Sequence, residues 1–136
     1  TIVHHRLGIR AKWGAPGFST DYLYTDGQVS DIRLKENIEN SETDALETVN
    51  RMKVRQFDWK ERMGGWHQNI GFVADELEEI DPNLALGGGY DENGEMDIKQ
   101  INSPYLLNYA IKAIQELSAK VDEQEKRIKE LERRLQ

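Results

Sequence analysis

The chain has 136 residues, enough for one domain or for a small domain with an extension. Charged residues make up 32% of it and hydrophobic residues 38%, so we expect much surface per residue, as in a long helix or an oligomer arm. It has no cysteine, which excludes disulfides, thiolate catalysis and cysteine-ligated zinc, and its net charge of −7 disfavours nucleic-acid binding.

The charge is unevenly distributed and divides the chain into three segments. Residues 1–29 and residues 104–136 each carry a net charge of +1, whereas residues 30–103 carry eight basic and seventeen acidic groups. We therefore predict three parts with these boundaries. No apolar run reaches the roughly 18 residues that a membrane span needs, so we expect no membrane partner.

The first segment is predicted to be β structure. Apolar and polar residues alternate over residues 7–13, a turn follows at residues 14–17, and a second short strand ends at Asp26–Gly27. Such short strands have too few apolar residues to make a core. We expect this segment to need a partner chain or upstream sequence.

The middle segment combines helical and strand patterns. Residues 41–52 fit a short helix with Ser41 or Thr43 as its N-cap. The other predicted elements are a strand with an aromatic face over 53–60, a buried strand over 70–73 that passes into a short acidic helix stopped by Pro82, and a hairpin over 84–100 that turns at glycines or at Asn93–Gly94.

The third segment is predicted to be one long helix, with Ser103 as N-cap and Pro104 at the first helical position. Its apolar residues repeat every 3.5 residues over more than four heptads, and Gln124 is the one polar core position. This repeat predicts a coiled coil. The apolar a and d positions are Leu107, Ala110, Ile114, Leu117, Val121, Ile128, Leu131 and Leu135.

The flanking charges favour a parallel arrangement of self-associating helices. Lys120 would face Glu125 of a parallel neighbour, and Arg127 would face Glu132. Isoleucine at a with leucine at d favours two strands, whereas residues 127–132, RIKELE, resemble a pattern that favours trimers. The number of strands stays open, and a lone helix with a solvated face is the alternative.

Ser30 and Lys35 form a candidate nucleophile and base in the stretch VSDIRLKENI. A serine–lysine pair needs a neutral amine to take the hydroxyl proton. A spacing of five residues separates the two side chains on a regular helix or strand, so they can meet only if the backbone changes conformation between them. The alternative is that Ser30 or Asp31 caps a helix while Lys35 is solvated.

Three motifs in this order give the chain a resemblance to a known family. Ser-Asp-x-Arg-x-Lys followed by isoleucine is present as Ser30, Asp31, Arg33, Lys35 and Ile38. A second motif is similar to GFVADELEEIDP, with Asp75 where glutamine is usual and Leu77 where valine is usual, and a third to LLNYAIKAIQEL at 106–117. From residue 30 onward the chain resembles the self-cleaving intramolecular chaperone domains that end phage endosialidases, tail spikes and tail fibres.

The resemblance implies an α+β domain that trimerises, assists folding of an upstream fibrous stalk, often a triple β-helix, and then cuts itself off. Ser30 would be the nucleophile, Lys35 the general base, and Val29–Ser30 the scissile bond. Asp31 and Arg33 would hold the loop geometry. The chain would act during virion assembly in the host cytoplasm, where its C-terminal part is released and its N-terminal part, the end of the stalk, stays in the virion appendage.

We expect no cofactor, no metal and no small-molecule substrate. His4 and His5 are adjacent and would point to opposite faces of a strand, and His67 stands alone. Two other interpretations stay open. One is a trimerisation module with an inert serine–lysine pair, and the other is a receptor-binding tip that stays on the fibre and binds through exposed aromatic residues.

Overall fold

The computed structural model describes residues 29–136, and the chain falls into two units, residues 1–41 and residues 42–136. The strands predicted over 7–13 and up to Asp26–Gly27 lie outside the described residues. Within residues 29–41 there is one short 3₁₀ helix, Ile32–Leu34.

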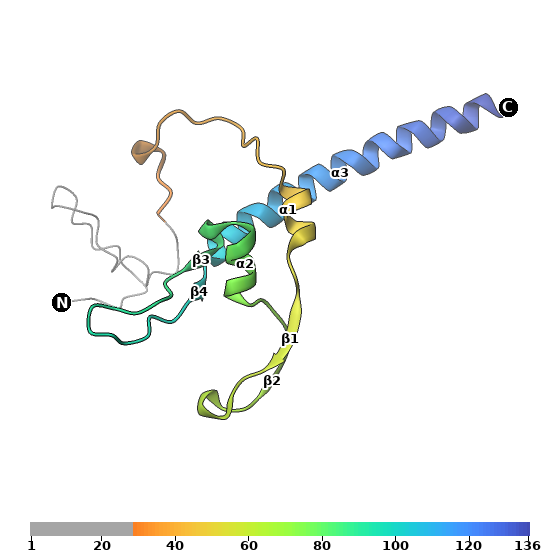
Figure 1. Cartoon of the computed structure of the whole chain (residues 1–136). Helices are drawn as coiled ribbons and strands as arrows, with labels where there is room; N and C mark the ends of the chain where they lie inside the picture. The colour runs from red at the N-terminus through yellow and green to blue at the C-terminus, as the bar shows by residue number, and fades with distance from the viewer. Residues whose placement is uncertain (1–28) are drawn as a thin grey trace. The chain divides into compact units, whose positions relative to one another are not determined.

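The second unit combines helices with two small antiparallel sheets, so the predicted α+β class is confirmed (Figure 1). None of the described helices is long and apolar enough to cross a membrane. The helices and strands of this unit are α1 (Ala45–Arg51), β1 (Arg55–Asp58), β2 (His67–Gly71), α2 (Ala74–Ile80), β3 (Ala85–Leu86), β4 (Gln100–Ile101) and α3 (Ser103–Arg134).

Helix α3 is one unbroken helix, as its repeat predicts, and its 32 residues span about 48 Å. Its N-cap is Asn102, whose side chain accepts a hydrogen bond from the Tyr105 amide at 3.3 Å. The predicted cap, Ser103, is instead the first helical residue, because the side-chain oxygen of Asn102 already accepts from a backbone N–H group of the first turn. Arg133 and Arg134 in the last turn complement the helix dipole.

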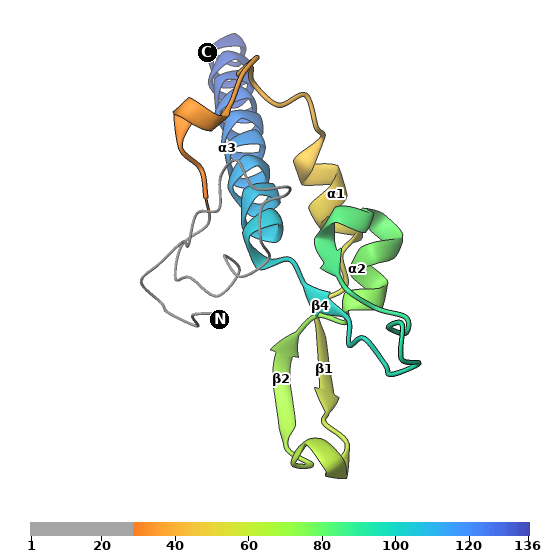
Figure 2. The same cartoon turned by 90° about the vertical axis from the view of Figure 1, so that its left-hand side faces the viewer.

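Helix α1 lies alongside the N-terminal half of α3, and the C-terminal half of α3 extends beyond α1 and α2 (Figures 1 and 2). Small side chains form this contact: Ala45 is fully buried, and Thr48 and Ala113 are almost so. Asp44 caps α1, accepting a hydrogen bond from the Glu47 amide, so the predicted caps Ser41 and Thr43 are wrong by one to three residues.

A second small core lies between α2 and β3, where Leu77, Leu84 and Ala85 are buried. Ala45 and Ala113 are the other buried apolar residues in the described part of the chain, while twenty large apolar side chains there are exposed. A core this small contributes little to the free energy of folding. The described residues therefore leave most of their large apolar side chains without a cover.

Strands β1 and β2 form an antiparallel hairpin with a bulge between Arg55 and Phe57. The predicted aromatic face is present: the Phe57 and Trp59 rings meet edge to face, with centroids 5.5 Å apart. The predicted strand over 70–73 is wrong in two respects. It ends at Gly71, and Ile70 is 70% exposed rather than buried, because a two-stranded hairpin covers only one face.

Strands β3 and β4 close the predicted hairpin over 84–100, with a further bridge between Tyr90 and Met96 and a turn at Asn93–Gly94. Gly87 has a φ of +74°, and a Cβ there would lie 2.9 Å from the Ile98 carbonyl oxygen. A glycine is needed at this position because any side chain would collide with the opposite strand.

Candidate active site

The candidate site is built on a single turn of 3₁₀ helix between Ser30 and Lys35. Asp31 is extended and caps this turn, because its Oδ1 accepts a hydrogen bond from the Arg33 amide at 2.8 Å. The Lys35 amide closes the turn on the Ile32 carbonyl at 3.1 Å, and Lys35 is extended again. The backbone thus changes conformation twice within five residues.

These two changes bring the side chains of Ser30 and Lys35 together. Lys35 Nζ donates a hydrogen bond to Ser30 Oγ at 2.6 Å. A continuous helix or strand would separate them, but one tight turn between extended residues reverses the direction in which the second side chain points. The arrangement places a lysine amine in contact with a serine hydroxyl, directly after the Val29–Ser30 peptide bond, as the predicted nucleophile and base require.

Asp31 and Arg33 form a bidentate ion pair on the same turn. Arg33 donates from Nε to Asp31 Oδ1 at 3.0 Å and from its terminal nitrogen to Oδ2 at 2.8 Å. The hydrogen bonds from the Arg33 side chain and amide hold the pKa of Asp31 below its ordinary value. Because the pair is exposed to solvent, it contributes little to stability, and its effect is to define the shape of the turn.

The serine–lysine pair and its neighbours are exposed to solvent in the single chain. Ser30 and Lys35 are both exposed, and so are three large apolar side chains around them, Ile32, Leu34 and Ile38, at 71%, 52% and 64%. A lysine in water is almost entirely protonated near pH 7, and burial favours its neutral form. The geometry of a dyad is present, but its water-excluding surroundings are not.

In the second unit, Lys112 and Glu116 hold the start of α1, and we call these two residues the clamp. Glu116 accepts hydrogen bonds from the amides of Leu46, at 2.6 Å, and Ala45, at 3.3 Å. Lys112 donates to the Thr43 carbonyl at 2.5 Å and to Glu116 at 2.8 Å. Both residues lie within the third sequence motif, but the motif by itself predicts no role for either of them.

The electrostatics of the clamp are consistent with its contacts. Hydrogen bonds from the Lys112 side chain and then from the Leu46 amide hold the pKa of Glu116 below its ordinary value. Glu116 is therefore ionised at neutral pH, as an anion at a helix N-terminus should be. The sequence signal for the pair is a lysine and a glutamate four residues apart on the helix, among apolar residues.

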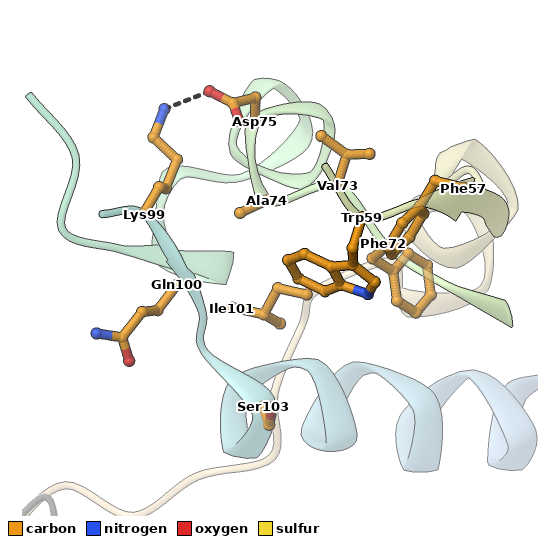
Figure 3. A pocket seen from close by; sticks show the side chains of 10 residues that line it. All are labelled: Phe57, Trp59, Phe72, Val73, Ala74, Asp75, Lys99, Gln100, Ile101 and Ser103. Atoms are coloured by element: carbon orange, nitrogen blue, oxygen red, sulfur yellow. Dashed lines mark hydrogen bonds and ion pairs between the residues drawn. The ribbon is translucent and has the colours of Figure 1, made fainter. Parts of the chain in front are cut away.

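A pocket of about 550 Å³ lies between the β1–β2 hairpin, α2, β4 and the start of α3 (Figure 3). Its apolar wall includes Phe57, Trp59, Phe72 and Ile101, which Figure 3 shows close together. Asp75, which stands where the family motif has glutamine, also lines the pocket. The other lining residues are Val73, Ala74, Lys99, Gln100 and Ser103.

Asp75 is bound by a lysine of the opposite hairpin. Lys99 Nζ lies 2.8 Å from an Asp75 oxygen and 3.2 Å from Glu78, so it joins β4 to α2. The hydrogen bond from Lys99, followed by its charge, lowers the pKa of Asp75. The aspartate that stands where the family motif has glutamine thus forms an ion pair, far along the chain from Ser30 and Lys35.

The predicted association residues of α3 are exposed in the single chain. Among the large apolar side chains at the a and d positions, exposure ranges from 47% for Leu131 to 87% for Leu135, while the smaller Ala110 is half-buried. The others are Leu107, Ile114, Leu117, Val121 and Ile128, each about half exposed or more. Such a continuous apolar stripe on a helix is characteristic of a surface that a partner helix covers.

The remaining candidates within the described residues are His67 and Trp66, both on the β1–β2 hairpin. His67 Nδ1 lies 2.6 Å from Asp58 on the exposed hairpin, and Trp66 stacks on Trp59 with centroids 5.8 Å apart. No group of three potential metal ligands is present in residues 29–136. His4 and His5 lie outside this range.

Comparison with known proteins gives matches over most of the chain. Residues 30–86 match a family of peptidases described as "Chaperone of endosialidase". The chain is 34% identical over 113 residues to a probable tail fiber protein of Escherichia phage Phieco32, covering 82% of this chain and 15% of that protein. It is 25% identical over 168 residues to an uncharacterized membrane protein of Dictyostelium discoideum, covering 92% of this chain and 10% of that protein. The chain thus spans a small part of the length of these relatives.

Proposed function

Because residues 30–86 of this chain belong to the family described as chaperone of endosialidase, we propose that it is the self-releasing chaperone end of a phage fibre. Three copies associate through α3, hold three upstream chains in register while these fold, and then cut the Val29–Ser30 bond. The observation that carries the cutting step is the 2.6 Å hydrogen bond between Ser30 and Lys35.

The proposed cleavage is an acyl shift followed by hydrolysis. Ser30 Oγ attacks the carbonyl carbon of Val29, and its proton passes to a neutral Lys35 Nζ and then to the departing backbone nitrogen of Ser30. The product is an ester between Val29 and the Ser30 side chain. Water hydrolyses this ester, which leaves a carboxylate on Val29 and a free hydroxyl and α-amine on Ser30.

The exposure of the pair supports a requirement for assembly. Assembly is not needed to bring the two side chains together, because Ser30 and Lys35 already meet within one chain. What one chain lacks is burial. Covering Ile32, Leu34 and Ile38 with a neighbouring copy would exclude water from Lys35 and favour its neutral form.

Two further observations support self-association. The apolar stripe of α3 is exposed over its whole length, and the core of the described residues is small. Charges beside the stripe favour a parallel arrangement, since Lys120 and Arg127 would each face a glutamate of the neighbouring copy. A parallel bundle brings the N-terminal ends of three copies together, where upstream chains could pair in register.

The alternative is a trimerisation module that is retained at the fibre tip and does not cut itself. The exposed stripe of α3 supports it equally well, since it needs no chemistry at Ser30. The two functions differ only in whether the Val29–Ser30 bond breaks. The likeness to a tail fibre protein supports both.

Denaturing mass spectrometry of the freshly purified chain tests the proposal. Wild type should lose residues 1–29 and begin at Ser30, whereas Ser30→Ala should stay intact because it has no nucleophile. Lys35→Ala should cut at least ~100-fold more slowly, the usual size of a general-base contribution. Lys53→Ala, which removes another exposed lysine, should cut like wild type. An intact wild-type chain would leave only the trimerisation module.

A further inference from the structure

The clamp of Lys112 and Glu116 holds the end of the peptide that carries the serine–lysine pair. Lys35 is followed by residues 36–42 and then by Thr43, whose carbonyl Lys112 binds. Residues 36–42 are exposed, and the chain from Lys35 to Thr43 can reach at most about 29 Å. The clamp therefore anchors one end of the connection to the turn that carries Ser30 and Lys35, which we call the catalytic turn.

The clamp also decides where α1 begins. Helix α1 has seven residues, too few to be stable as an isolated helix. Its first two amides are held by Glu116, from outside the helix. Without these bonds the first turn would fray, and the connection from Lys35 to the first ordered turn of α1 would lengthen by about a turn of helix, or roughly four residues.

The clamp and the association stripe occupy the same turns of α3. Glu116 follows Ile114 by two residues, about 200° around the helix axis, so the two side chains project from nearly opposite sides. Ile114 is 63% exposed, while Glu116 binds the backbone of α1. The same segment of α3 thus carries the association stripe on one side. On the other side it carries the clamp, which anchors the connection to the catalytic turn.

We propose that Lys112 and Glu116 are positioning residues for the self-cleavage of the chain. They anchor the connection to the catalytic turn on α3, so that association of α3 also limits how far Ser30 and Lys35 can move from the assembly. This role rests on the proposed function. It goes beyond that function by assigning part of the coupling between association and cleavage to two residues that touch neither Ser30 nor Val29.

Exchanging the two charges isolates this role. The double variant Lys112→Glu with Glu116→Lys keeps the composition, the net charge and an ion pair four residues apart, in the orientation that helices favour. It places a carboxylate against the Thr43 carbonyl and an ammonium against the amides of Ala45 and Leu46. The association stripe is untouched. Lys112→Arg is the matched control, because guanidinium can also donate to a carbonyl and a carboxylate.

The experiment measures cleavage by denaturing mass spectrometry and oligomer mass by sedimentation, on the full chain. The charge exchange should leave the oligomer mass unchanged and slow cleavage at least twofold. Lengthening the connection by about half would lower the effective concentration of the catalytic turn, and so the cleavage rate, about twofold. Misplacing a reacting group can lower the rate by up to about 100-fold. Lys112→Arg should retain wild-type cleavage.

Cleavage of the charge-exchanged oligomer at the wild-type rate would overturn the positioning role while leaving the proposed function intact. If the charge-exchanged chain does not assemble, Glu116→Gln decides in its place, because it leaves one acceptor oxygen for the Leu46 amide, the Ala45 amide and Lys112 together, and so weakens the clamp without reversing its charges. An assembled Glu116→Gln that cuts more slowly than wild type supports the role, and one that cuts equally fast overturns it. A wild-type chain that never cuts would instead overturn the proposed function, and the positioning role with it.

Discussion

Asp31 and Arg33 show how few residues are needed to bring a lysine amine to a serine hydroxyl five positions away in the chain. Asp31 caps the turn through its side chain, and Arg33 occupies both of its carboxylate oxygens. The turn they define sends Lys35 back to Ser30. The motif residues between serine and lysine thus have a structural reason to be there, whatever the chemistry of the pair.

Tyr109 and Asp81 join α3 to the segment that follows α2. The Tyr109 hydroxyl donates to Asp81 Oδ2 at 2.5 Å. Burial and then this hydrogen bond raise the pKa of Tyr109 to about 12. Burial acts to raise the pKa of Asp81, but hydrogen bonds from Tyr109 and Asn83 outweigh it, so the pKa lies below its ordinary value.

The pH dependence of this pair is a prediction at the residue scale. A raised tyrosine pKa stabilises the folded state fully below the unfolded value, about 10, and the contribution is lost as pH rises through about 12. Tyr109→Phe should therefore cost about 1 kcal/mol at pH 8, and the difference from wild type should shrink between pH 10 and 12. Thermal unfolding across this range measures it. Tyr90→Phe, at a residue 77% exposed, should match wild type throughout, and a constant gap for Tyr109→Phe would contradict the assignment.

At the scale of elements, α3 has two different faces. One packs small residues such as Ala113 against α1 and carries the clamp, while the other exposes the stripe from Leu107 to Leu135. Two views of the molecule show α1 beside the N-terminal half of this helix, with the rest extending past it (Figures 1 and 2). The N-terminal half can therefore serve the module and the assembly at once.

Charges placed in the stripe should abolish both association and cutting. Ile114→Asp with Ile128→Asp would bury two carboxylates per chain at the helix interface, at a cost on the order of 3–5 kcal/mol each. Sedimentation should then give a monomer, and mass spectrometry an intact chain. Gln115→Asp with Ala119→Asp adds the same charge at two exposed positions outside the stripe and should behave like wild type. Efficient cutting by the monomer would refute the requirement for assembly.

At the scale of the whole molecule, the exposed apolar residues and the small core belong to one design. A chain that leaves twenty large apolar side chains exposed within residues 29–136 is suited to folding together with copies of itself. Under the proposed function, the assembly device is no longer needed once the upstream part has folded. Its removal would leave a product that cannot easily refold once it has unfolded, and we call this effect a kinetic lock.

This kinetic lock predicts a difference in reversibility. A fibre that carries this chain at its C-terminus and the Ser30→Ala change should regain its trimer after thermal unfolding and cooling, because the chaperone part is still attached. The cleaved wild-type fibre should not regain it. Sedimentation before and after one heating cycle measures the recovered fraction, and equal recovery by both fibres would argue against the lock.

Local features of this protein follow from the sequence because their causes are local. The length of α3, the neighbouring rings of Phe57 and Trp59 and the turn at Asn93–Gly94 depend on residues close together in the chain, and all three are confirmed in the structure. The motif of Ser30 to Ile38 likewise identified the family, and the match over residues 30–86 confirms it.

Other features were decided by the tertiary structure. Asp44 and Asn102, rather than Thr43 and Ser103, are caps because the register of each helix depends on what it packs against, and Ile70 is exposed because no second layer covers the hairpin. The clamp of Glu116 on α1 joins residues some seventy positions apart. Its bonds run from side chain to backbone between two elements, so no periodicity along the chain predicts them, and only packing brings their partners within reach.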